Sequence, residues 1–228
     1  VSSFALRGTG VESDMDEVAT KIIEILKKHM KEPRDDISLS TQLTDLKIES
    51  GKVARLAFSQ SDPRGRSLLW NQQLHVALGY EHGARISVLR MDAPTAELPG
   101  ARDLPAPRYV LPNGEGAGYG LFTLDPASRT FFLNHLPEIG DAVTRGTAWL
   151  TLWDDMLEGG TSPADLFALA LRALPQETEE QNVERILAYT SDTYWRFLSD
   201  AERAGASSRL EQALLAGMLT RYKSAKAN

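Results

Sequence analysis

Residues 107–125 read PRYVLPNGEGAGYGLFTLD, and the character of the chain changes across this stretch. The spacing of the glycine-rich segment 114–120 misses the G-x-G-x-x-G pattern of a nucleotide loop. The segment is therefore interpreted as a tight turn that needs positive φ. The residues that follow it, LFTL, are strand-like, and a nucleotide loop would need a helix there. Asp125 and Pro126 then form an N-cap with proline at the first helical position. The stretch therefore predicts strands before it and helices after it.

Upstream of this turn, the sequence predicts a β module over residues 53–124. Apolar residues alternate with others in three segments, 53–60, 74–79 and, more loosely, 85–90. Turn-forming residues separate these segments, at Asp62–Gly65 and at His82–Gly83. The four prolines of residues 92–107 indicate an extended connector. We expect a small antiparallel β-sandwich.

Downstream, residues 125–228 predict a helical domain. Helix ends are indicated at Gly159–Gly160 and Pro175, and Ser162–Pro163 predicts another helix start. The pattern Ser208-Arg-Leu-Glu211 is typical of a capping box and predicts the start of the last helix. Five helices joined by short turns favour an antiparallel bundle or an α-solenoid. The expected fold class is α+β.

The N-terminal part differs in composition. Residues 1–12 are interpreted as a flexible leader, and residues 13–52 as an amphipathic helix followed by a loop. Six lysines lie within the first 52 residues, and none occurs again before Lys223, although fifteen arginines lie between Val53 and Arg221. This distribution favours two pieces of different origin joined near residues 50–53. A biased composition arising by chance is the alternative.

The overall composition excludes several classes of protein. The chain has 228 residues, 25 Lys and Arg against 31 Asp and Glu, a net charge of −6 and no cysteine. A net negative charge argues against nucleic acid as a partner, and the absence of cysteine removes disulfides and thiolate metal sites. No apolar run has the length of a membrane span or of a signal-peptide core. We expect a soluble chain without a membrane partner, and a cytoplasmic rather than a secreted location.

Motifs of known enzyme classes are missing from the sequence. It contains no H-E-x-x-H, no G-x-S-x-G, no S-x-x-K and no phosphate loop, so we assign no catalytic and no metal-binding residue. A hydrolase site assembled in space stays open as an alternative. Asp154 and Asp155 are interpreted as solvated acids rather than metal ligands. Four aromatic residues at helical spacing are interpreted as core, with a ligand cage as the alternative: Trp149, Trp153, Tyr194 and Trp195.

The stretch 107–125 resembles the aminopeptidase N family of zinc metallopeptidases, at the junction of its β-sandwich and C-terminal helical domains. The residues that match the family pattern are Asn113, Gly118, Tyr119 and Asp125. The resemblance extends over about residues 53–224. The substrate loop and the zinc helix of that family have no counterpart here. The resemblance therefore implies a non-catalytic region that packs against a catalytic peptidase domain or binds peptides.

A second, shorter resemblance links residues 16–50 to the start of an acyl carrier protein. That family attaches phosphopantetheine to a serine in an Asp-Ser-Leu motif, for which Ser50 is the counterpart, with Glu49 and Gly51 beside it. The carrier pattern stops after Ser50. The alternative that follows is a carrier-type module modified at Ser50; otherwise no cofactor is expected.

Overall fold

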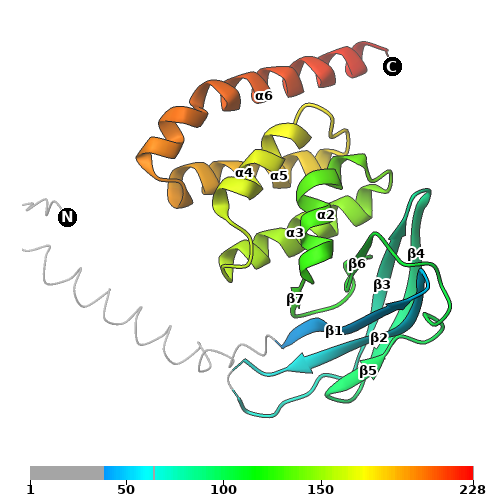
Figure 1. Ribbon diagram of the computed structural model, residues 1–228. Helices are drawn as coiled ribbons and strands as arrows, with labels where there is room; N and C mark the ends of the chain where they lie inside the picture. The colour runs from blue at the N-terminus through cyan, green and yellow to red at the C-terminus, as the bar shows by residue number, and fades with distance from the viewer. Residues whose placement is uncertain (1–38, 64, 228) are drawn as a thin grey trace, which may run out of the picture. The chain divides into compact units, whose positions relative to one another are not determined.

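The computed structural model describes residues 39–63 and 65–227. The predicted leader and the predicted N-terminal helix lie outside these ranges. Within them, two sheets are followed by helices, which confirms the α+β class (Figure 1).

The strands form two sheets with mostly antiparallel pairing. The first sheet has the order β5-β2-β1-β7 and consists of β5 (Thr95–Glu97), β2 (Lys52–Ser61), β1 (Ser40–Glu49) and β7 (Leu121–Thr123). The second has the order β4-β3-β6 and consists of β4 (Gly83–Met91), β3 (Gln72–Tyr80) and β6 (Tyr109–Leu111). The one parallel pair among the described strands joins β1 and β7. The connector predicted over 92–107 contains β5, which pairs with β2.

The core of the sandwich lies between the two sheets. It is built from apolar side chains that alternate along β2 and β3, among them Val53, Leu56, Phe58, Leu74, Val76 and Leu78. Alternation places every second side chain on one face of a strand, so these residues meet across the gap between the sheets.

The prediction of a loop before residue 52 is wrong for residues 40–49, which form strand β1. This strand pairs antiparallel with β2, and Ser50 and Gly51 form the turn between them. Both turn residues have positive φ, 50° and 75°, as a two-residue turn of type I′ requires. The composition change near residue 52 thus falls inside a hairpin. The pairing has two register shifts, one with the extra residue Thr44 in β1 and one with the extra residue Ala54 in β2. The extra residue in β1 interrupts its alternation, which is why the strand is hard to recognise in the sequence.

Five α-helices are described after the sandwich. They are α2 (Pro126–His135), α3 (Ala142–Leu157), α4 (Pro163–Ala173), α5 (Glu180–Asp192) and α6 (Asp200–Ala227), with a 3₁₀ turn at Leu136–Glu138 and a π-helical turn at Thr193–Phe197. The side chains of Asp125, Asp141 and Ser162 accept backbone N–H groups at the starts of α2, α3 and α4. These caps fix where the chain enters each helix.

The predicted start of the last helix at Ser208 is wrong. Helix α6 begins at Asp200 and continues through Ser208. The capping box lies earlier, where the Ser199 hydroxyl accepts from the Glu202 N–H and the Glu202 carboxylate accepts from the Ser199 N–H at 2.8 Å.

Strand β6 and residues 76–79 of β3 are buried on both faces, because their second face belongs to the helical core. Strand β4, at the edge of this sheet, alternates between buried and exposed side chains. Ala77, Tyr109 and Leu111 pack in the same cluster as Phe132 of α2 and side chains of α3 and α4. A Cβ on Gly79 would lie 1.9 Å from the Tyr109 ring, so only glycine lets this ring cross β3. The contact between the sheet and the helices therefore depends on the glycine at position 79 of β3.

Our first prediction concerns the hydrogen bond that joins sheet and helix. The buried Ser128 hydroxyl on α2 accepts from the Val110 N–H of β6 at 2.8 Å. Ser128→Ala leaves that N–H buried without a partner, which costs about 1–3 kcal/mol of unfolding free energy in urea titrations. Thr130→Ala, on the exposed side of the same helix, should cost less than about 0.5 kcal/mol. Equal stability of the two variants would contradict this role.

Candidate functional site

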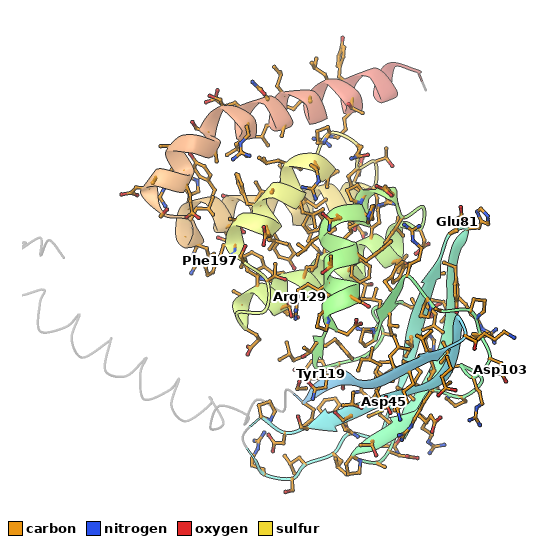
Figure 2. All side chains as sticks on the ribbon, in the orientation of Figure 1. Asp45, Glu81, Asp103, Tyr119, Arg129 and Phe197 are labelled. Carbon is orange, nitrogen blue, oxygen red and sulfur yellow. The ribbon has the colours of Figure 1, made fainter. Side chains whose placement is uncertain are left out.

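A groove opens where the sandwich meets the helices. Its volume is ≈ 340 Å³, and its walls come from the tip of the β3–β4 hairpin, from the end of α2 and from the start of α3. Figure 2 shows Glu81 at the tip of that hairpin. The lining residues lie in three separate parts of the sequence, 80–84, 108–109 and 131–144.

Aromatic rings and one cation line part of the groove. The Arg108 guanidinium lies 4.9 Å from the centroid of the Phe131 ring, and the His135 ring lies 5.2 Å from the same ring. Phe131 also packs on Tyr109 at 4.9 Å between centroids. Burial raises the pKa of Tyr109, and the nearby Asp141 carboxylate adds to this rise. This wall thus offers aromatic surface to a ligand.

Carboxylates dominate the rim. Glu81 is exposed at the hairpin tip, and a Glu138 oxygen lies 3.1 Å from Nδ1 of His135. The Thr144 N–H donates to Asp141 at 2.7 Å, and this hydrogen bond is the main cause that lowers the pKa of Asp141. The rim therefore carries negative charge at neutral pH and suits a cationic group.

A buried ion pair holds the wall behind the groove. Two nitrogens of Arg145 donate to the Glu177 carboxylate at 2.6 and 2.8 Å, and Nη1 donates to the carbonyls of Ile139 and Gly140 at 2.8 and 2.9 Å. Burial opposes ionisation of Glu177, but the hydrogen bonds from Arg145 and from backbone N–H groups outweigh it and lower the pKa of this carboxyl. The pair thus fixes the loop that forms one side of the groove.

The residues of the aminopeptidase resemblance lie elsewhere, around a smaller hollow of ≈ 230 Å³. The Asn113 amide accepts from the Gly118 N–H at 2.8 Å and donates to the Gly118 carbonyl at 3.2 Å. Tyr119 stacks on Trp70 at 5.0 Å between centroids. The structure brings Asn113, Gly118 and Tyr119 together, whereas Asp125 caps α2.

Ser50 is exposed in the turn between β1 and β2. The residues after it form a strand, whereas the carrier family continues with a helix that modifying enzymes recognise. Modification of Ser50 by phosphopantetheine stays a prediction.

The structure also places the acidic and aromatic residues that the sequence singled out. Asp155 is buried and accepts from Arg129 at 2.7 Å and from the Thr161 hydroxyl at 2.6 Å, so its interpretation as a solvated acid is wrong. Burial raises the pKa of its neighbour Asp154.

The four aromatic residues interpreted as core fall into different environments. Trp149 is fully buried, and Tyr194 is largely buried beside Phe167. Trp153 stacks on Tyr189 at 4.3 Å between centroids. Trp195 is 69% exposed, so it is not a core residue.

Our second prediction concerns the pH dependence of the Arg145–Glu177 pair. Because the pKa of Glu177 is lowered in the folded state, its carboxylate stabilises the fold above the ordinary pKa of glutamate. This contribution is lost as the pH falls through the folded-state pKa. Glu177→Gln should cost about 3 kcal/mol at pH 7, because a buried Arg145 loses its charged partner.

The difference between wild type and Glu177→Gln in thermal unfolding should shrink as the pH falls below about 4, where the wild-type carboxylate also becomes neutral. The matched control is Glu180→Gln at the exposed start of α5, for which the difference should be small at every pH. A constant difference for Glu177→Gln between pH 7 and pH 3 would show that charge is not the cause.

Among residues 39–63 and 65–227, no three His, Cys, Asp or Glu side chains lie close enough together to hold a metal ion. None of the helices in the same ranges combines the length and the apolar composition of a membrane span. Comparison of the sequence with protein-family models and with curated proteins finds no match. The groove and the ion pair behind it are therefore the features from which a function can be inferred.

Proposed function

We propose that this chain is a non-catalytic accessory region that binds a peptide segment in the groove between sandwich and helices. In this role it corresponds to the sandwich and helical domains that the aminopeptidase N resemblance implies, packed against a catalytic peptidase part. The observation that carries the proposal is the groove itself, with its aromatic wall and acidic rim.

The size and chemistry of the groove favour a short peptide as its ligand. A volume of ≈ 340 Å³ is at the lower end of the range of ligand pockets and suits a few side chains rather than a folded domain. Phe131, which is partly exposed, offers apolar surface, and Glu81 and Glu138 offer negative charge at the rim. A peptide with basic and apolar side chains matches both features.

Contacts within the chain hold the walls of the groove. Arg145 holds the loop at Ile139–Gly140, and the Tyr109 ring is fixed between β3 and α2. Little conformational entropy would then be lost on binding, which favours affinity for a site of modest size.

The third prediction tests the acidic rim. A fluorescein-labelled hexapeptide of alternating Lys and Leu should bind more tightly than one of alternating Glu and Leu in fluorescence polarisation. Added salt should weaken this binding, because the rim charges are screened. The double variant Glu81→Arg/Glu138→Arg should weaken binding of the Lys peptide at least about tenfold.

The matched control is Glu184→Arg, at an exposed position of α5 that does not line the groove, and it should leave the affinity unchanged. Equal affinity for the two peptides, or equal losses in the groove variant and the control, would contradict peptide binding at this site.

The fourth prediction separates an accessory role from an enzymatic one. The pure chain should hydrolyse neither aminoacyl-anilides nor simple esters, with or without a metal chelator. Chelator-sensitive release of the anilide would indicate a zinc aminopeptidase site and overturn the proposal. Chelator-insensitive ester cleavage would instead favour a hydrolase site assembled in space.

A further inference from the structure

A second hollow lies between the glycine-rich loop and helix α3, apart from the groove of the proposed function. Its volume is ≈ 230 Å³, and it shares no lining residue with the groove. The loop side includes Gly116, Gly118 and Gly120, which contribute backbone and no side chain. The α3 side contributes Thr151 and Asp154, which are three residues apart and therefore lie on one face of the helix.

Asp154 has no counter-charge in the described part of the chain. Its side chain is half-buried, and burial, together with the nearby Glu158 carboxylate, raises its pKa. Among the same described residues, its carboxylate accepts no hydrogen bond and pairs with no basic side chain. Asp155, the next residue, is by contrast paired with Arg129. A carboxylate that is partly removed from water without a donor costs free energy, which a cation beside it would recover.

The other polar groups around the hollow favour a hydrogen-bond donor as the ligand. The Thr151 hydroxyl donates to the Thr147 carbonyl at 2.9 Å, so its oxygen can still accept a hydrogen bond. The N–H groups of Gly116 and Gly118, to which an anion could bind, already donate to oxygens of Asn113. The hollow therefore suits a cation better than an anion.

Apolar groups form the remaining walls of the hollow. The Tyr119 ring stacks on Trp70 with 16° between the ring planes, and 56% of this tyrosine is exposed. Leu150 of α3 is 40% exposed, and Phe122 of β7 is buried. A chain of methylene groups packs on such surfaces, while the charged group at its end reaches a polar partner. A small hollow with apolar walls and one carboxylate thus fits the side chain of a lysine.

We propose that the hollow between the glycine-rich loop and α3 binds an alkylammonium group, such as the end of a lysine side chain, on the Asp154 carboxylate. The ammonium is compact and has three donors, so it can bond both to Asp154 and to the Thr151 oxygen about one helical turn away. The methylene stem packs against Tyr119 and Leu150. This site uses no residue of the groove, so it does not depend on the proposed function.

The fifth prediction tests the charge with two probes that share one stem. In NMR titrations of the isotope-labelled full chain, Nα-acetyl-lysine amide should shift the amide signals of Gly116, Gly118 and Gly120 until they saturate. Nα-acetyl-norleucine amide, which lacks only the ammonium, should bind at least about tenfold more weakly. A third probe, n-pentylamine, distinguishes two sources of the same chemistry: it binds as well as the lysine probe if free amines enter the site, and more weakly if the peptide backbone contributes.

Asp154→Asn should weaken binding of the lysine probe at least about tenfold, because asparagine has the same size but no charge. Asp165→Asn, at an exposed position of α4 outside the hollow, is the matched control and should leave the affinity unchanged. Equal affinity of the wild type for the lysine and norleucine probes would overturn the proposal. Signal shifts confined to Gly83 and Gly140 would also overturn it, because these residues line the groove instead.

Thermal unfolding without a probe tests whether the Asp154 carboxylate is unpaired. Because its pKa is raised, the folded chain disfavours the ionised form, so Asp154→Asn should not lower the melting temperature at neutral pH. A melting temperature lowered by more than about 2 °C would show that Asp154 already has a stabilising partner within the chain, and would overturn the proposal.

Discussion

The Tyr109 side chain lies across the backbone of Gly79 and packs against the rings of Phe131 and Phe132. Through this contact one face of β3 and β6 becomes part of the helical core, while the other face of their sheet fills the sandwich. A strand buried on both faces cannot shift by one residue without moving every side chain to the wrong side. The same contact therefore fixes the register of β3, the position of α2 and the walls of the groove between them.

Two buried ion pairs fix how neighbouring helices are joined, which apolar packing alone does not determine. Arg129 and Asp155 join α2 to the end of α3, and Arg145 and Glu177 join α3 to the turn before α5. Burying such charges is costly, and an apolar pair of the same volume can be as stable. The ion pairs instead fix the orientation of the elements that they join, because a guanidinium donates along fixed lines to both carboxylate and carbonyl oxygens. Arg145 uses this property to hold the loop beside the groove.

The parts of the fold that local chemistry determines could be predicted from the sequence. Asp125 and Ser162 begin helices where a cap followed by proline indicates them, and the alternation over 74–79 appears as β3. Strand β1 was missed because the extra residue Thr44 breaks its alternation. Helix α6 begins before the Ser208 pattern because Ser199 and Glu202 form a capping box ahead of it. The groove could not be predicted, since its three lining segments meet only through long-range packing. The sequence does carry one signal for the ion pair that holds the loop beside the groove. Glu177 is a carboxylate in a short turn between two amphipathic helices.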